Sequence, residues 1–229
     1  VGFSFHADYD LFEEIIDHYD WDFCQIQYNY LDTEFQAGKK GLKYAHNKGI
    51  EVVIMEPLRG GTLAQEPPKD VKTILDNSDK NRNAVNWSLQ WLWDQKEVSV
   101  VLSGMSTMDQ IKENISLASN ADQNSLSSKE SKLVTKARKK FLDIFPVACT
   151  GCNYCVPCPQ GVAIPNIFSL YNEAKIYDKY ETNNKRYFNM SEKARADNCV
   201  ECGQCEEACP QNLNIIDYLK DVTNYFKEE

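Results

Sequence analysis

Two patterns of apolar residues alternate along the first 120 positions of the chain. Short runs rich in β-branched and aromatic residues are typical of buried parallel strands, whereas apolar residues three and four positions apart are typical of helices with one buried face. The patterns predict strands over residues 1–5, 23–27, 51–55 and 98–102, and helices over residues 11–19, 34–48, 82–95 and 106–118. Strands that alternate with helices in this way indicate an α/β fold built on a parallel sheet.

This α/β region is expected to be half of a larger fold. Four strand–helix units are too few to close a barrel, and an open half would leave two sheet edges unpaired, which natural proteins avoid. The sequence also begins with Val1 inside a predicted strand, without an initiating Met, so we expect a fragment of a longer protein. The last predicted helix of this region is expected to bury an apolar face made of Met108, Ile111, Ile115 and Ala118.

A change in composition divides the chain. Residues 119–130 are mostly polar and mark a domain boundary. A helix is predicted over residues 127–145, and another over residues 165–180 inside a cysteine-rich region. We expect three parts: an α/β domain over residues 1–122, a linker helix over residues 123–146, and a mostly helical cysteine domain over residues 147–229.

Charge and hydropathy exclude several functions. The chain of 229 residues has a net charge of −9, which argues against nucleic acid as a partner because phosphates favour basic surfaces. One basic run, residues 136–140, is interpreted as the solvated face of a helix rather than as a docking site. No apolar run is long enough to cross a membrane and no signal peptide is visible, so we expect a cytoplasmic protein without a membrane partner.

Eight of the nine cysteines lie in two short runs after residue 148. The second run, from Cys199 to Cys209 and followed by Pro210, has the C-x2-C-x2-C-x3-C-P spacing of bacterial ferredoxins. The first run, from Cys149 to Cys158, is one residue shorter before its last cysteine. Three thiolates at this spacing can each bind a different iron of one cubane, while the fourth cysteine points away from it. The runs therefore predict two [4Fe–4S] clusters in a ferredoxin-type domain.

The fourth cysteine of each run is expected to ligate the cluster of the other run. One cluster is assigned to Cys149, Cys152, Cys155 and Cys209, and the other to Cys199, Cys202, Cys205 and Cys158. The alternative is a pair of structural zinc sites, but zinc usually takes two separated cysteine pairs around one ion. The triplet spacing and the Cys-Pro ends favour iron–sulfur clusters. The ninth cysteine, Cys24, is interpreted as a buried core thiol.

Four short motifs follow one another in the α/β region: Val1–His6, Gln25–Asn29, Met55–Gly61 and Leu102–Ser106. In this order they resemble the ends of the fifth to eighth strands of an aldo/keto reductase, in the branch of that family with a C-terminal iron–sulfur extension. The resemblance implies the second half of a (β/α)8 TIM barrel, followed by a mostly helical, two-cluster ferredoxin-like domain. The family's Asp, Tyr, Lys and His tetrad comes from the first four strands, so the resemblance names no catalytic residue in this sequence.

The resemblance also implies a nicotinamide cofactor at the ends of the strands. Ser4 and Gln25 would hold the carboxamide of NAD(P)H, and a loop would lie along the pyrophosphate. Met55 stands where the family commonly stacks an aromatic ring on the nicotinamide, and Gln110 is uncharged where NADP-binding members carry basic side chains. NADH, NADPH and a flavin therefore all stay as candidates. The loop residues are Pro57, Leu58, Arg59 and Gly60, and the residues expected around the adenosine end are Gly104, Ser106, Glu113 and Asn114.

Two functions are compatible with these features. The first is an oxidoreductase that transfers hydride between a nicotinamide and a carbonyl or alcohol of a small-molecule substrate, while the clusters pass single electrons to or from a partner protein. A flavin could connect the two, because a hydride carries two electrons and each cluster takes one. The alternative is a barrel without chemistry that serves as a dock for a ferredoxin-like electron carrier. Since exposed clusters are sensitive to oxygen, we expect an anaerobic or microaerobic cytoplasm in either case.

Overall fold

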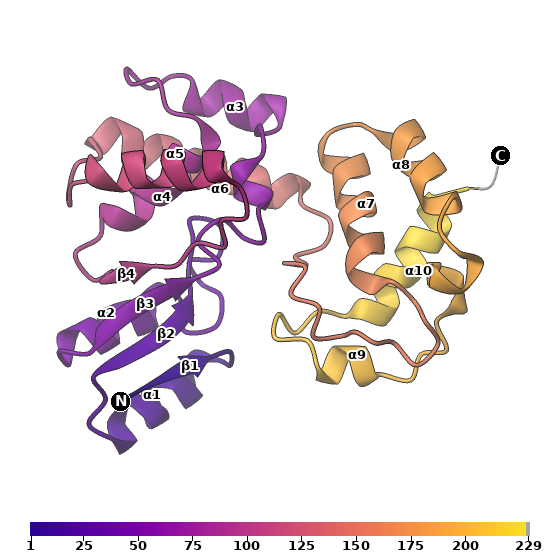
Figure 1. Ribbon diagram of the computed structural model, residues 1–229, viewed down its shortest axis with the longest axis horizontal. Coiled ribbons are helices and arrows are strands. Elements are labelled where there is room, and N and C mark those ends of the chain that lie inside the picture. The colour runs from indigo at the N-terminus through magenta and orange to yellow at the C-terminus, as the bar shows by residue number, and fades with distance from the viewer. Residues whose placement is uncertain (228–229) are drawn as a thin grey trace. The chain divides into compact units, whose positions relative to one another are not determined.

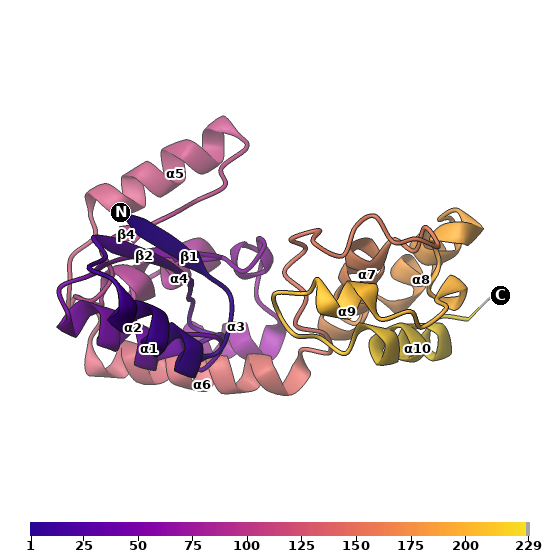
Figure 2. The same cartoon turned by 90° about the horizontal axis from the view of Figure 1, so that it is seen from below.

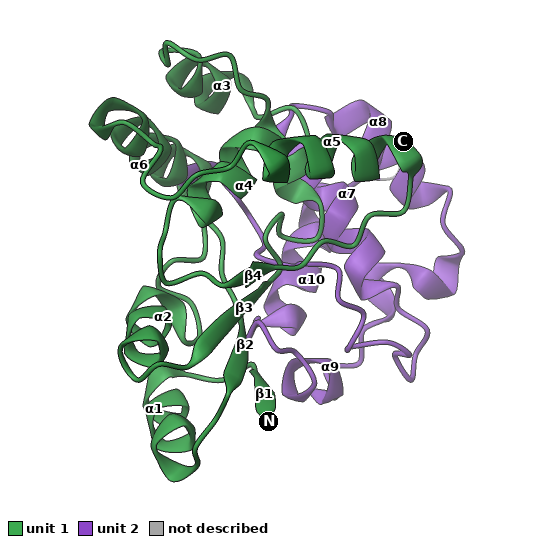
Figure 3. Ribbon diagram, turned by 60° about the vertical axis from the view of Figure 1, so that its left-hand side comes forward, with its two compact units in different colours: residues 1–142 green, residues 143–229 purple. Residues whose placement is uncertain are grey.

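The computed structural model describes residues 1–227 and divides the chain into two compact units, which meet between Leu142 and Asp143 (Figure 3). The helix predicted over residues 127–145 is present as α6 (Ser128–Ile144). Most of α6 belongs to the first unit, whose last residue is Leu142.

The strands of the first unit form one parallel sheet in the order β1-β2-β3-β4 (Figure 1). Their bounds are β1 (Gly2–Phe5), β2 (Phe23–Gln27), β3 (Glu51–Met55) and β4 (Val100–Val101). The prediction of an α/β fold with a parallel sheet is confirmed. The register places Ser4 opposite Gln25 and Gln25 opposite Val53, so side chains at these positions lie side by side across the strands.

Helices α1 and α2 pack beside each other on one face of this sheet (Figure 2). Alternate strand residues point toward them, and Cys24, Ile26, Val52 and Ile54 are fully buried there. Cys24 is a core thiol, as predicted, and burial raises its pKa to about 12. The helices of the unit are α1 (Tyr9–His18), α2 (Gly38–Asn47), α3 (Lys69–Leu75), α4 (Ala84–Trp93), α5 (Met108–Ser119) and α6, with a short 3-10 turn η1 (Thr62–Ala64).

The prediction that α5 buries its apolar face is wrong. None of its residues is buried, and Met108 and Ile115 are 62% and 58% exposed. The only helix with which α5 makes extensive contact in the described chain is α4, so nothing covers the apolar side of α5 within this unit. Its N-terminus is nevertheless well defined by a capping box between Thr107 and Gln110.

Helix α6 is tied to the rest of the first unit by charged side chains. Glu130 is buried and forms an ion pair with Arg82, whose Nη2 lies 3.1 Å from its Oε1. In the basic run, Arg138 Nε donates to the carbonyl oxygen of Leu31 at 3.2 Å, and Lys140 pairs with Asp70. The basic run is therefore partly engaged in packing the helix rather than wholly solvated.

The second unit is helical, and no strand is found between residues 143 and 227. The helix predicted over residues 165–180 is present as α7, which ends earlier than predicted, and Asp178, with φ 53°, separates it from α8. A core cluster joins α7 to the last helix through residues such as Phe168, Ile215 and Leu219. The elements are α7 (Ile164–Ile176), α8 (Tyr180–Phe188), η2 (Glu192–Ala194), η3 (Ala196–Asn198), α9 (Gln204–Glu207) and α10 (Ile215–Tyr225).

Across residues 1–227, every helix is too short or too polar to span a bilayer.

Candidate metal centre and cofactor cavity

The two cysteine runs have the same backbone course. The third residue of each run, Gly151 or Glu201, is left-handed, with φ of 72° and 57°. The fifth residue, Asn153 or Gly203, is also left-handed, with φ of 66° and 79°. The runs therefore turn in the same way at the same positions, although only two of these four residues are glycines.

Side-chain hydrogen bonds fix the chain on either side of the runs. Asn172 on α7 donates to the carbonyl oxygen of Val147 at 2.8 Å and accepts from its amide at 3.0 Å. This two-way clamp holds the backbone two residues before Cys149. In the same way, Asn184 on α8 bonds to both backbone groups of Lys227 and fixes the segment that follows α10.

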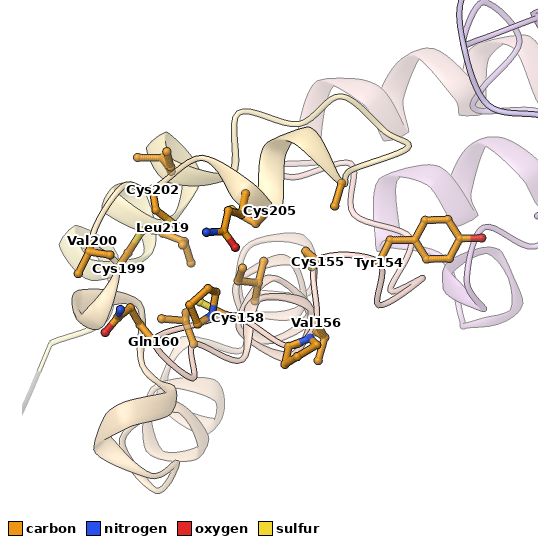
Figure 4. Close-up of a pocket in the computed structure, with 17 residues that line it drawn as sticks. Tyr154, Cys155, Val156, Cys158, Gln160, Cys199, Val200, Cys202, Cys205 and Leu219 are labelled. Atoms are coloured by element: carbon orange, nitrogen blue, oxygen red, sulfur yellow. The ribbon is translucent and has the colours of Figure 1, made fainter.

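The folded unit brings the eight cysteines around two cavities. Cys155 and Ile164 line both of them, so the two cavities are immediate neighbours. One cavity is lined by Cys149, Cys152, Cys155 and Cys209, and the other by Cys158, Cys199, Cys202 and Cys205 in addition to Cys155. Figure 4 shows Cys158, Cys199, Cys202 and Cys205 around the second cavity, with Tyr154 directed away from it.

These donors fit a cluster better than a single ion. In residues 1–227, no three His, Cys, Asp or Glu side chains are placed to hold one metal ion. A zinc ion needs all its sulfur ligands about 2.3 Å from one point. The second cavity has a volume of about 240 Å³. The first has a volume of about 20 Å³, and Cys152 in its lining is exposed.

The electrostatics of the thiols agree with this grouping. Burial raises the pKa of Cys155 to about 11, and the next contributions that raise it come from Cys149, Cys152 and Cys209. Burial also raises the pKa of Cys205 to about 11, with Glu206 and Cys199 adding to the effect. These two thiols are therefore protonated at neutral pH in the absence of iron, and metal binding must displace their protons.

One polar group at the first cavity has no partner. Thr150, directly after Cys149, is 7% exposed, and its hydroxyl makes no hydrogen bond to any described residue. It lines the cavity together with the four cysteines of the first set. Sequence reasoning missed this residue, because a threonine between two cysteines carries no signal of its own burial.

A separate cavity of about 370 Å³ lies in the first unit, where β3 ends and α5 begins. The carboxyl ends of parallel strands are the usual place for a ligand in such sheets. The structure brings six of the predicted cofactor residues into its lining: Pro57, Leu58, Gly60, Gly104, Glu113 and Asn114.

The other predicted cofactor residues lie outside that lining. Gln25 Nε2 donates to Ser4 Oγ at 3.3 Å and to Met55 Sδ at 3.4 Å, and Met55 does line the cavity. Ser4 and Gln25 are thus hydrogen-bonded to each other, and Met55 links Gln25 to the cavity. Ser106 is exposed, and its amide and hydroxyl both bond to Gln110 at the start of α5.

The Arg59 side chain is directed into the protein instead of the cavity. It is 3% exposed, and its Nε donates to Asp32 Oδ2 at 3.2 Å. The same carboxylate oxygen accepts from Gln27 at 3.0 Å and from Asn29 at 2.9 Å. This buried network follows the C-terminal end of β2. Polar residues directly after an apolar strand were the only sequence signal for it.

Glu56 is a cavity residue that sequence reasoning missed. It follows β3 in a left-handed conformation with φ 55°, and its carboxylate accepts from the amide of Gly60 at 2.5 Å. Burial is the main cause that raises its pKa above the ordinary value. The lining contains two carboxylates, Glu56 and Glu113, and no lysine or arginine.

Comparison with known proteins identifies both parts of the chain. The sequence model of the aldo/keto reductase family matches residues 1–138, and that of the 4Fe-4S dicluster domain matches residues 148–214. A search of curated proteins gives no match.

Solved structures of an aldo-keto reductase from Bacillus halodurans are similar to part of the chain. The holo form has 20% identity and a TM-score of 0.49, covering 59% of this chain and 49% of the other. The apo form has 20% identity and a TM-score of 0.47, covering 57% and 48%. The chain therefore spans about half the length of these structures.

Proposed function

Because the chain belongs to the aldo/keto reductase family and continues into a 4Fe-4S dicluster domain, we propose that it is part of an oxidoreductase that couples nicotinamide-linked carbonyl or alcohol chemistry to electron transfer. The observation that carries the proposal is the pair of neighbouring cavities, which are lined by four and five cysteines with Cys155 in common, in a chain that also has a cavity of about 370 Å³ at its strand ends. When bound, each cluster supplies one-electron transfer at a potential set by its surroundings.

The proposed ligand sets follow the cavities. Cys149, Cys152, Cys155 and Cys209 would hold one cluster, and Cys158, Cys199, Cys202 and Cys205 the other. The second cysteine of each run, Cys152 or Cys202, is exposed. Exposed ligands support the exchange of electrons with a partner protein, since electrons enter and leave most readily where a cluster approaches the surface.

A nicotinamide nucleotide is the proposed occupant of the cavity in the first unit. The Gln25 amide and Ser4 hydroxyl would bind its carboxamide, and the turn from Pro57 to Gly60 would follow the pyrophosphate. Glu113 would accept a hydrogen bond from the adenine amine. This carboxylate already accepts from Asn83 Nδ2 at 2.6 Å, which fixes its orientation. A flavin is a second possible occupant, because it exchanges electrons singly as well as in pairs.

The proposal is tested by anaerobic addition of NADH, and then NADPH, to the complete protein while the cluster absorbance and EPR signal are followed. Dithionite is the control that establishes how far the clusters can be reduced. We expect one nucleotide to reduce the clusters in the wild type. Gln25→Ala should slow this reduction at least tenfold, whereas Gln65→Ala, at an exposed position outside the cavity lining, should leave it unchanged.

The second candidate function is a non-catalytic barrel that docks a ferredoxin-like electron carrier. It is favoured by the cavity lining, which offers two carboxylates and no cationic side chain to a dinucleotide's phosphates. If dithionite reduces the clusters but neither nucleotide does so, and no nucleotide binding is measured, this function replaces the first.

A further inference from the structure

The two cysteine runs differ in burial at the position after their first cysteine. Thr150 follows the first cysteine of the first run, and Val200 follows the first cysteine of the second. The surrounding backbone turns in the same way in both runs, so these two positions are structurally matched. Thr150 is 7% exposed and Val200 is 59% exposed. One run therefore buries a hydroxyl next to its cysteines. The other has a largely exposed apolar side chain there, which also lines the second cavity.

The Thr150 hydroxyl lacks an acceptor in the polypeptide. Buried hydroxyl groups in native proteins almost always have a hydrogen-bond partner, and an orphan calls for an explanation. This hydroxyl finds none among residues 1–227, yet it lines the cavity of Cys149, Cys152, Cys155 and Cys209. The acceptors in the lining are the cysteine sulfur atoms and the side-chain amides of Asn153 and Gln211, and neither amide bonds to the hydroxyl. A bound cluster would add its sulfides to this set.

The two runs also differ in the charged side chains that they carry. The first run carries no ionisable side chain other than its cysteines and Tyr154 between residues 149 and 158. The second contains Glu201, Glu206 and Glu207 within residues 199–209. Lys220 pairs with Glu201 at 3.0 Å, whereas Glu206 and Glu207 directly follow Cys205. Negative charge near a cluster disfavours the added electron, whereas a hydrogen bond to its sulfur favours it.

We propose that the Thr150 hydroxyl donates a hydrogen bond to a sulfur of the cluster held by the Cys149 set, and that this cluster is the more easily reduced of the two. In the exchange between them, one electron leaves the cluster of the Cys199 set, which is oxidised, and reduces the cluster of the Cys149 set; no proton moves. Electrons entering the domain therefore collect at the Cys149 set. The inference rests on the proposed cluster ligands and is independent of the nucleotide chemistry.

The test is a potentiometric titration of the holoprotein with dithionite as the reductant, followed by EPR. Thr150→Val removes the hydroxyl while keeping the shape of the side chain. We expect it to lower the potential of the more easily reduced cluster only, so that the two midpoints move closer together. Thr150→Ser keeps the hydroxyl and should retain most of the wild-type separation. Thr182→Val is the control: it removes an exposed hydroxyl on α8, outside the lining of both cavities, and should leave both midpoints nearly unchanged.

The outcomes separate this inference from the proposed function. The inference is overturned if T150V leaves both midpoints in place, shifts them equally, or lowers only the less easily reduced cluster. Should T150V not retain its iron, Thr150→Ala gives the same comparison with a smaller side chain. Iron and sulfide analysis that finds fewer than two clusters in the wild type contradicts the cluster assignment itself. Failure of NAD(P)H to reduce the clusters affects only the proposed nucleotide chemistry, because the titration does not use it.

Discussion

The two units of the chain use cysteine in opposite ways. The first unit contains one cysteine, Cys24, which is fully buried among apolar side chains and whose pKa is raised to about 12. The second unit contains eight, none of them fully buried, and most pack against the edge of its core. A buried thiol with a high pKa is inert, whereas half-exposed thiols grouped around a cavity can exchange protons for iron. The position of a cysteine relative to the core thus separates a packing role from a ligand role.

The two units also differ in the interactions that stabilise them. The first has a sheet whose strands and helices bury a continuous apolar core. The second has a helical core of similar size, but both of its cysteine runs lie outside regular structure except for the single turn of α9. We therefore expect the first unit to be stable through its own side chains and the second to depend on its clusters.

Removal of the clusters is expected to have the largest effect. Stripping iron anaerobically with a chelator should destabilise the second unit by on the order of several kcal/mol, the scale of structural metal sites. Hydrogen exchange should show loss of protection in α7 and α10, while β2 and β3 keep theirs. If α7 and α10 stay as protected as in the holoprotein, the helical core is sufficient without iron, and the contrast between the units is wrong.

Loss of the buried ion pair in the first unit is the next largest effect. Asp32→Ala removes the carboxylate from the buried Arg59 and should cost about 3–5 kcal/mol. All four tryptophans lie in residues 1–142, so their fluorescence in urea reports this unit, while the cluster absorbance reports the other. Asp70→Ala is the control: it removes an exposed ion pair with Lys140 and should cost no more than about 1 kcal/mol. Equal losses in the two variants would contradict the assigned role of burial.

Nucleotide binding is expected to depend on Glu56. Burial is the main cause that raises its pKa, and nearby Asp32 adds to this, while the Gly60 amide and Arg59 oppose it. The charged form is therefore disfavoured relative to an ordinary glutamate, and Glu56 ionises at a higher pH than such a residue does. A phosphate beside it should then bind more weakly as the pH rises.

Glu56→Gln removes this charge and should flatten the pH profile. At pH values above the range in which Glu56 ionises, the variant should bind NAD⁺ about three- to tenfold more tightly than the wild type, a difference of about 0.7–1.4 kcal/mol. Calorimetry on the complete protein over a range of pH measures the NAD⁺ affinity of the variant and of the wild type. Glu66→Gln, at an exposed position outside the cavity lining, should keep the wild-type profile. An unchanged profile in E56Q would mean that the phosphates lie away from this loop.

The parts of the fold that sequence could predict are those with local causes. Strands β2 and β3 were predicted at their observed bounds, because each is a short run with few alternatives to a strand. Helix α10 was not predicted, although Ile215, Leu219 and Val222 lie at helical spacing in the sequence. Helix α8 was hidden by its polar composition, since its buried residues include Asn183 and Asn184.

The unpredicted features of the sites depend on contacts between distant parts of the chain. Arg59 was expected along the pyrophosphate, but a carboxylate 27 positions earlier holds its guanidinium. The burial of Thr150 and the hydrogen bond from Gly60 to Glu56 likewise follow from loop conformation, which residue types alone do not encode. By contrast, the cysteine spacing restricts the geometry so strongly that the grouping around the two cavities agrees with the predicted ligand sets.

The smallest expected effect concerns α5, the helix whose apolar face stays exposed. Thr107→Ala removes the side chain that accepts from the amide of Gln110, and loss of such a cap costs about 1 kcal/mol. Since α5 buries no residue, this cost should appear as local fraying and leave global unfolding of the first unit almost unchanged. Hydrogen exchange should become faster in α5 alone, and Thr107→Ser, which keeps the hydroxyl, should restore the wild-type rate. A drop in global stability equal to the local cost would show instead that the exposed face of α5 is packed against another part of the protein in solution.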